Sequence, residues 1–274
     1  MIIWLASYPK SGNTWIRAFL ATYMFSEDLN FSFKNLEKIN QFPLLKNFTD
    51  ISINPKNLLE CSKNWIPAQE WLNLSNKTIF LKTHSSICTI NKNNFTNKEN
   101  TLGAIYLVRD PRDVLVSYAK HDDSTLDYSL QSMINSTNLG TLKDDEKNRF
   151  LYMIGSWSEN YNSWKNFNLT KKIIIKYEDL LKNSYENLLK IIKYLNDMCG
   201  LNVDEERIQK VNELTNFSNL QSMEKKYGFS ERLSKKEMFF RNGKVGEWKN
   251  ILSKKQSNLI EKTFEKEMTE LGYL

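Results

Sequence analysis

Apolar and polar positions follow two different periods along this chain, and the changes between them predict strands separated by helices. Short runs that are mainly apolar are typical of buried parallel strands, whereas apolar residues at intervals of three and four predict helices. The predicted strands are residues 2–7, 77–83, 103–109 and 171–177. The clearest predicted helices are residues 16–25, a helix from Pro111, and the stripe Leu188, Ile191, Ile192 and Leu195, which ends near Gly200.

The remaining segments have weaker patterns. Residues 26–76 contain prolines and bulky aromatic residues, which predict short helices and loops whose aromatics either line a pocket or simply pack. Residues 122–148 are polar and predict a mobile surface excursion. Large apolar residues predict two further helices: a long one with Tyr152, Trp157, Tyr161 and Trp164, and a last one with Ile260, Phe264, Met268 and Leu271 on its packing face.

Strands that alternate with helices predict a parallel sheet with right-handed crossovers. We therefore expect an α/β fold in which helices flank a central parallel β-sheet, and a single domain over residues 1–274. Ligands of such sheets bind beyond the carboxyl ends of the strands. Candidate motifs follow Ser7, Leu81 and Val108, so we expect them to converge on one site.

The composition is consistent with this fold and adds a hint about the ligand. A chain of 274 residues, 41% of them hydrophobic, can bury one large core or at most two small ones. The net charge of +6 indicates either an acidic ligand, such as a nucleotide, nucleic acid or acidic glycan, or only a solvated lysine-rich surface.

Two further features bear on the location of the protein. Cys61, Cys88 and Cys199 are far apart and lack CxxC spacing, so we expect neither a disulfide framework nor a zinc site, and a reducing cytoplasm is the simpler expectation. The opening apolar run is too short for a secretory signal or a membrane span, and we read it as the first strand.

The strongest motif is Tyr8-Pro9-Lys10-Ser11-Gly12-Asn13-Thr14-Trp15, which lies between the first strand and the first helix. The free N–H groups and the dipole of a helix N-terminus favour an anion such as phosphate or sulfate. Its spacing is not that of the nucleotide-triphosphatase loop, because the lysine precedes the only glycine. The alternative is an ordinary turn with an exposed lysine. The candidate anion-binding residues are Lys10, Ser11, Gly12, Asn13, Thr14 and Trp15.

This string resembles the 5′-phosphosulfate loop of the sulfotransferases that use 3′-phosphoadenosine-5′-phosphosulfate (PAPS). The family pattern reads approximately YPKSGTTW, so Asn13 replaces a threonine. The resemblance implies a P-loop nucleotide-kinase-like, three-layer architecture and PAPS as cofactor, with the bisphosphate PAP as product and no metal requirement.

A second motif lies after the third predicted strand. Arg109, with Ser117 eight residues later, resembles the pair that binds the 3′-phosphate in this family, and an arginine at a strand end suits bidentate phosphate binding. Asp110 and Pro111 are suited to begin a helix. We expect Arg112 to pair locally with an aspartate and to be structural.

A third motif, residues 241–250 (RNGKVGEWKN), is similar to the family segment RKGxxGDWKN. Arg241 and Gly243 match the family segment. Asn242 replaces a lysine, and Lys244 is the candidate to supply the missing positive charge. Weaker matches imply an adenine site: Tyr177 begins a YEDL string, and Thr215 and Phe217 bracket a variant of TSF. Residues 155–157 (GSW) also match the family and are expected to be structural.

Residues 82–84 (KTH) resemble the catalytic string of the family. The resemblance implies that His84 is the base, and a neutral imidazole can accept the proton of an acceptor hydroxyl. Lys10 and Lys82 would stabilise charge during in-line transfer. We expect His121 to have a surface or packing role.

Three alternatives remain open at this stage: a nucleotide-dependent kinase of related fold, a nucleic-acid-binding protein, and a protein that binds nucleotide without turnover. The expected partner is a small-molecule, glycan or lipid-headgroup acceptor, with a hydroxyl or amine as the target, and not nucleic acid. Residues 26–76 and 122–150 are expected to shape its pocket. The dimer motif of many relatives, KxxxTVxxxE, is absent near Ser253, and the oligomeric state is open.

Overall fold

The centre of the protein is a parallel β-sheet. The structure is a computed structural model that describes residues 1–48, 53–143, 149–168 and 170–274, and in these ranges the sheet has the order β2-β3-β1-β6-β9 with every pair parallel. The prediction of an α/β fold with a central parallel sheet is confirmed. The strands are β1 (Ile2–Ser7), β2 (Asn40–Gln41), β3 (Ile79–Thr83), β6 (Thr101–Val108) and β9 (Lys171–Lys176).

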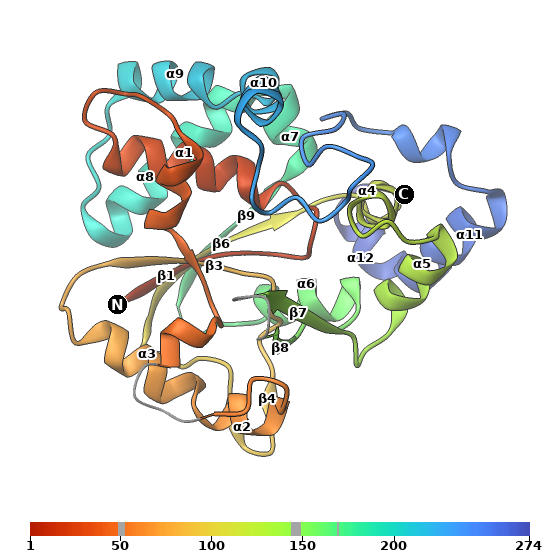
Figure 1. Cartoon of the computed structure of the whole chain (residues 1–274), viewed down its shortest axis with the longest axis horizontal. Coiled ribbons are helices and arrows are strands. Elements are labelled where there is room, and N and C mark those ends of the chain that lie inside the picture. Colours follow the sequence, from red (N-terminus) through yellow and green to blue (C-terminus); the bar gives the residue numbers. More distant parts are fainter. Residues whose placement is uncertain (49–52, 144–148, 169) are drawn as a thin grey trace.

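Helices cover both faces of this sheet, so the molecule has three layers (Figure 1). Helices α1, α8 and α9 lie on one side, whereas α3 and α6 lie on the other. The helices of the described ranges are α1 (Asn13–Phe25), α2 (Leu58–Lys63), α3 (Trp65–Asn73), α4 (Pro111–His121), α5 (Leu126–Ile134), α6 (Trp157–Lys165), α7 (Tyr177–Lys182), α8 (Ser184–Cys199), α9 (Glu205–Leu214), α10 (Phe217–Tyr227), α11 (Lys254–Thr263) and α12 (Glu265–Glu270).

Alternation along the buried strands builds a core on each face. In β1, Ile3 and Leu5 belong to the core with α1 and α8, whereas Trp4 and Ala6 belong to the core with α3 and α6. The whole strand is buried, as expected for a strand in the middle of a covered parallel sheet. The loop that follows β1 is therefore held between two packed layers.

Short elements complete the fold outside the central sheet. In the part of the chain that the structure describes, these are two antiparallel strand pairs, β4 with β5 and β7 with β8, and three short 3₁₀ helices. Their bounds are β4 (Thr89–Ile90), β5 (Asn93–Asn94), β7 (Leu139–Lys143), β8 (Arg149–Met153), η1 (Phe33–Lys38), η2 (Leu45–Phe48) and η3 (Glu247–Asn250).

Three predictions about elements were wrong. Tyr152 lies in β8 and not in a long helix, because Gly155 has a φ of 71° and Ser156 starts α6 with a capping box to Glu159. The last predicted helix is two helices, α11 and α12, that meet at Phe264, although its apolar face is buried as expected. Tyr177 begins α7 instead of ending a strand.

The predicted surface excursion also has regular structure. Residues 122–143 contain α5 and β7, since the apolar side chains of Leu130 and Met133 are buried in the core, and residues 144–148 lie outside the described ranges. In the segment 26–76, Phe42, Phe48 and Trp65 are buried and pack on other aromatic rings. The packing alternative is therefore the correct one for these three residues.

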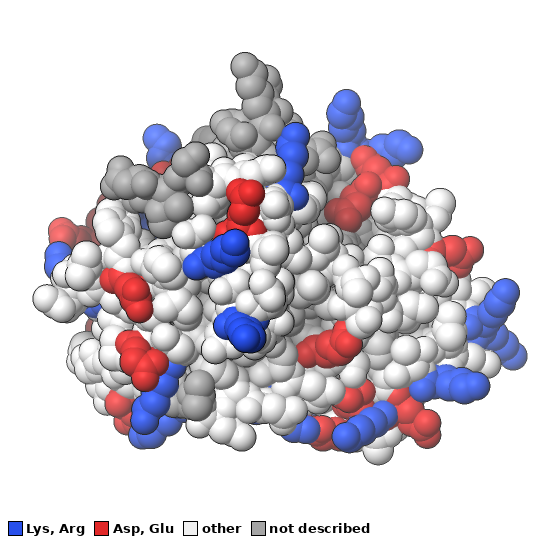
Figure 2. Space-filling model, turned by 90° about the horizontal axis from the view of Figure 1, so that it is seen from below, with Lys and Arg blue, Asp and Glu red and all other residues white. Residues whose placement is uncertain are grey.

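The outer surface is mixed in charge on the face shown in Figure 2. Lysine and arginine side chains are interspersed there with aspartate and glutamate, and the face has no extended area of a single sign. In the described ranges, no helix combines the length and the apolar character that a membrane span needs.

Candidate active site

The loop between β1 and α1 has the backbone geometry of an anion cradle. Lys10 and Gly12 have φ angles of 65° and 95°, and α1 begins at Asn13, so the N–H groups of its first turn face this loop. A side chain at residue 12 would collide with Tyr177, because a Cβ there would lie 2.6 Å from Cδ2 of that ring. The glycine therefore lets the loop pack against Tyr177.

Arg109 joins this loop to the third motif. Its guanidinium donates to the carbonyl of Lys10 at 3.2 Å and to that of Lys244 at 3.1 Å, and it lies 4.3 Å from the ring centre of Tyr177. Within the described ranges, Arg109 Nε and Ser11 Oγ are buried without a hydrogen-bond partner. Buried polar atoms of this kind normally have partners, so both fit a site that binds an anionic ligand.

The other residues of the first motif have structural contacts. The amide of Asn13 donates to the carbonyl of Leu5 at 3.1 Å and to Ser7 Oγ at 3.2 Å, so its Nδ2 points back to β1. Thr14 is buried, and Trp15 packs edge-on against Tyr177 with the ring centres 6.2 Å apart. The side chain of Asn13 therefore shapes the loop through its Nδ2, whereas its Oδ1 and Trp15 Nε1 are buried without a hydrogen-bond partner among the described residues.

Asp113 holds the third motif in place. Its carboxylate accepts from the N–H of Gly246 at 2.7 Å and from that of Trp248 at 3.1 Å. Ser117 is half-buried and lies one helical turn further along α4 on the same face, so it faces this segment. As expected, Arg112 pairs with Asp110, which also caps α4.

Phe217 and Thr215, which are expected near the adenine, have their contacts within the protein. The ring of Phe217 lies directly under Gly243, where a Cβ would be 2.6 Å away. The hydroxyl of Thr215 donates to the carbonyl of Val211 at 2.7 Å within α9 and its C-cap, so its one O–H donor is engaged, and the residue is fully buried.

Arg241 has a partner in the structure. Its Nη1 lies 2.6 Å from Glu247 Oε1 and its Nη2 contacts Oε2. Hydrogen bonds from Arg241, aided by its charge, lower the pKa of Glu247 to about 2. Asn242 is half-buried beside this pair.

His84 follows β3 and is held in one orientation. Its Nδ1 lies 2.9 Å from the carbonyl oxygen of Ser7, and because a carbonyl can only accept, Nδ1 carries the proton and Nε2 the lone pair. Asn160 donates to the carbonyl of His84 at 3.0 Å. Burial, with Lys82 nearby, lowers the pKa of His84 to about 3, so the imidazole is neutral at physiological pH.

The two candidate catalytic lysines lie beside His84 and are covered by one loop. Lys82 Nζ donates to Glu231 Oε2 at 3.1 Å, and the same carboxylate pairs with Arg17. Lys10 Nζ lies 3.9 Å from the ring centre of Phe239. Burial lowers the pKa of Lys10 to about 7, and the neighbouring charge of Lys82 adds to this effect.

Sequence reasoning missed Arg17, Glu231 and Phe239. Arg17 follows the first motif on α1 and was detectable as a buried-face arginine, but no local signal marks Glu231 or Phe239. His121 packs edge-on against Phe239, with ring centres 5.4 Å apart, which agrees with the packing role expected for it.

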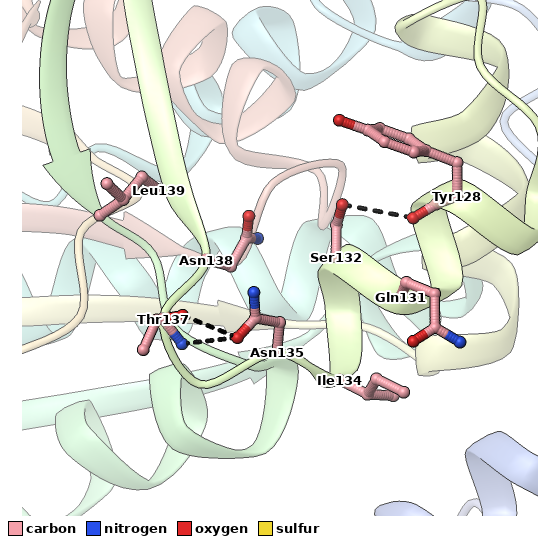
Figure 3. Close-up of a pocket in the computed structure, with 8 residues that line it drawn as sticks. All are labelled: Tyr128, Gln131, Ser132, Ile134, Asn135, Thr137, Asn138 and Leu139. Carbon is pink, nitrogen blue, oxygen red and sulfur yellow. Dashed lines mark hydrogen bonds between the residues drawn. The ribbon is translucent and has the colours of Figure 1, made fainter.

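A pocket of about 680 Å³ lies between α5 and β7 (Figure 3). At one end, Asn138 Nδ2 lies 3.5 Å from the hydroxyl of Tyr8, which precedes the anion loop. Among the described residues that line it, none carries a charge, and most have amide or hydroxyl groups. The lining is Tyr128, Gln131, Ser132, Ile134, Asn135, Thr137, Asn138 and Leu139.

Comparisons with known proteins agree on one family. The model of the sulfotransferase domain matches residues 2–272. Sulfotransferase 1B1 of Mus musculus is 26% identical over 283 residues, which cover 97% of this chain and 82% of the relative. Cytosolic sulfotransferase 3 of Arabidopsis thaliana is 27% identical over 272 residues, covering 94% and 73%.

Two solved structures have the same fold. Mouse sulfotransferase SULT7A1 complexed with PAP matches with a TM-score of 0.59 and 21% identity, over 97% of this chain and 84% of that one. Retinol dehydratase in complex with androsterone and inactive cofactor PAP matches with a TM-score of 0.64 and 22% identity, over 97% and 80%.

Proposed function

The chain belongs to the sulfotransferase domain family, and from this premise we propose that it transfers a sulfuryl group from PAPS to a hydroxyl or amine of an acceptor. The observation that carries the proposal is the junction at Arg109, whose guanidinium contacts both the loop of Lys10 and the segment of Lys244. The family match over residues 2–272 supports a single domain over residues 1–274.

The donor site combines three separate segments. The loop at residues 10–15 would hold the 5′-phosphosulfate, where Ser11 Oγ is buried without a partner in the described ranges. Arg109 and Ser117 would hold the 3′-phosphate, with the segment at Gly243 closing over it. Gly12 and Gly243 let these two segments pack closely against the rings of Tyr177 and Phe217.

The chemistry of the chain's own residues suits in-line transfer. When bound, PAPS supplies the sulfuryl group and leaves as PAP. His84 Nε2 accepts the proton of the acceptor, because Nδ1 is engaged by Ser7. The ammonium groups of Lys10 and Lys82 stabilise negative charge that develops beside them. As in phosphoryl transfer, positioning and electrostatics supply most of the rate.

The pocket between α5 and β7, whose described lining residues are uncharged, supports a neutral acceptor with several polar groups. Amide and hydroxyl side chains such as Gln131 and Asn135 can pair with hydroxyls, and the exposed ring of Tyr128 offers an aromatic face. Of the expected acceptor classes, a sugar or another polyhydroxylated molecule fits this lining best. A cytoplasmic location, as the names of relatives state for those proteins, is part of the proposal.

The test of the donor needs no acceptor. Thermal unfolding is measured with PAP and, separately, with ATP plus Mg²⁺, since a ligand that binds only the folded state raises its stability. We expect a shift with PAP alone, and a loss of most of it in Arg109→Ala. A shift only with ATP and Mg²⁺ would support a kinase instead.

With the donor established, acceptors are screened by transfer of labelled sulfate. Neutral sugars, phenols and amines are compared in the wild-type protein and in Gln131→Ala. We expect a raised KM for the productive class in the variant and an unchanged PAP shift. Productive transfer to a phenol, with no effect of Gln131→Ala, would contradict the assignment of this pocket.

A further inference from the structure

The loop that joins α10 to the third motif covers the catalytic lysines, and we call residues 228–240 the covering loop. Its C-terminal end and its middle are hydrogen-bonded to the body of the protein. The carboxylate of Glu224 accepts from the N–H groups of Phe239 and Phe240 at 2.7 and 2.8 Å. Ser234 Oγ donates to Asp123 at 2.6 Å, just beyond α4. The loop thus runs from α10 toward α4 (Figure 1).

Glu231 is the point where this loop reaches the catalytic residues. One carboxylate oxygen lies 3.1 Å from Lys82 Nζ, and the other pairs with Arg17 Nη1. The two cationic side chains are only 7% and 6% exposed, whereas that of Glu231 is 30% exposed. A carboxylate of a surface loop therefore enters a buried group of positive charges.

Arg17 gives this contact a fixed geometry. Its guanidinium donates to the carbonyls of Ile39 at 2.8 Å and Leu36 at 2.9 Å. These two bonds hold the planar guanidinium in one orientation, and its Nη1 then pairs with the carboxylate of Glu231 from a fixed position. Lys82, a flexible side chain, is then oriented by a carboxylate that is itself fixed.

We propose that Glu231 is a positioning residue for the transfer reaction: it orients the Lys82 ammonium beside His84 and keeps it charged, so the site is complete only when the covering loop is closed. This inference rests on the proposed function. It adds to that function a residue that the sequence motifs do not include, and it links the loop to catalysis.

The charges around Lys82 explain why a carboxylate is needed. Burial lowers the pKa of Lys82, Arg17 lowers it further, and Glu231 opposes both. Other elements add Lys10, His84 and His121. Lys10, with its pKa lowered to about 7, carries a positive charge in part of the molecules at neutral pH, whereas both imidazoles are neutral. Without Glu231, this ammonium would be buried among like charges, which strongly favours its neutral form. A neutral Lys82 could not stabilise developing negative charge.

The first experiment measures the loop alone, without donor or acceptor. Trypsin cleavage after Arg232 and Lys235, both in the covering loop, is followed by mass spectrometry in the wild-type protein and in Glu231→Gln. We expect cleavage to be at least about fivefold faster in the variant, since the loop loses its central ion pairs. Glu270→Gln is the matched control, because Glu270 pairs with Lys165 away from the site. Equal rates in all three proteins would overturn the proposed link.

The second experiment measures the consequence for the reaction. In Glu231→Gln we expect the PAP-induced thermal shift to be retained and kcat to fall by about 10-fold to 10²-fold, as for a misplaced catalytic group. We also expect the alkaline limb of the pH profile to shift to lower pH. Without Glu231, Lys82 loses its proton at a lower pH than in the wild type, so activity falls earlier as the pH is raised. Glu231→Asp retains a carboxylate and should recover part of kcat. If the role of Glu231 were purely structural, the pH profile of Glu231→Gln would be the same as that of the wild type.

Two outcomes would contradict the inference in different ways. Tighter PAP binding and higher kcat in Glu231→Gln would mean that the carboxylate blocks the site and is autoinhibitory. Faster cleavage with an unchanged kcat and pH profile would leave Glu231 with a structural role only. Absence of any PAP shift in the wild type would overturn the proposed function itself, and the cleavage result would still report on the loop.

Discussion

At the scale of single residues, the environment of His84 bears on the role of base that we propose for it. A histidine with an ordinary pKa near 6.5 is largely protonated in mild acid. Burial lowers the pKa of His84 to about 3, so the group stays neutral down to low pH. Its hydrogen bond to Ser7 also fixes the tautomer that leaves Nε2 free.

The first prediction concerns the pH dependence of His84. The base must be unprotonated, and a lowered pKa means that protonation sets in only at low pH. We therefore expect kcat/KM to show no acidic limb from this residue between pH 5 and 8, and His84→Ala to lose turnover while it retains the PAP-induced thermal shift. A limb near pH 6.5, or near-normal turnover in the variant, would remove His84 from the role of base.

The second prediction concerns Gly12 and separates two costs of a side chain. Gly200 has a φ of 71° with open space around it, whereas Gly12 has a φ of 95° and faces the Tyr177 ring. We expect Gly200→Ala to lower the free energy of unfolding by about 1–2 kcal/mol, because alanine is strained in a left-handed backbone conformation. Gly12→Ala should lose about 1–3 kcal/mol more through overpacking.

Urea denaturation of both variants measures these free energies of unfolding. PAP binding should be weakened in Gly12→Ala and unchanged in Gly200→Ala, because only the former alters the anion loop. Equal losses of stability in the two variants would show that Tyr177 moves aside at no cost.

At the scale of elements, α4 organises the candidate donor site through its first two turns. Its N-terminus follows Arg109 directly, and Asp113 in its first turns holds the third motif through two N–H groups. Its face also presents Ser117 to the same segment. One helix therefore sets the distance between residues that would bind the same phosphate.

The third prediction tests this anchoring. Asp113→Asn retains one acceptor oxygen, but its NH₂ group then faces one of the two backbone N–H groups. Leaving that N–H without an acceptor costs about 1–3 kcal/mol of free energy. We expect PAP affinity, measured by calorimetry, to fall about tenfold. Asp127→Asn on α5, which contacts only Gln256 at 2.7 Å in the described ranges, is the control and should bind PAP normally. Equal affinities would show that the segment holds its conformation without Asp113.

At the scale of the whole molecule, the candidate donor site joins parts of the chain that lie far apart in sequence. The first loop, the start of α4 and the third motif meet at Arg109, so the beginning and the end of the chain share one site. A ligand bound there would bridge these three segments at once, and its binding energy would stabilise the fold as a unit.

The fourth prediction follows from that arrangement. Hydrogen exchange is compared with and without PAP. We expect residues 8–15, 109–117 and 241–246 to gain protection together and at the same ligand concentration, whereas residues 58–73 should be unaffected. Protection of the first loop alone would mean that the third motif does not close over the ligand.

Local features of the sequence determined most of the fold and the position of the donor motifs. Strand, loop and helix start within a few residues of one another at Ser7 and at Val108, and each signal depends only on neighbouring side chains. The predictions that failed also depended on local patterns, but those patterns fit more than one type of secondary structure. An aromatic residue such as Tyr152 is compatible with either a strand or a helix. The positive φ of Gly155 ends the strand that contains Tyr152 before α6 begins.

Only the tertiary structure decided which side chains meet. Glu231 reaches Lys82 across 149 residues and Arg17 across 214, and Asp113 reaches Gly246 across 133. The amide of Asn13 turned inward to Leu5 and Ser7, and Phe42 turned out to be a core residue. The physical reason is that backbone preference is encoded by adjacent residues, whereas ion pairs and packing depend on distances that exist only once the layers have assembled.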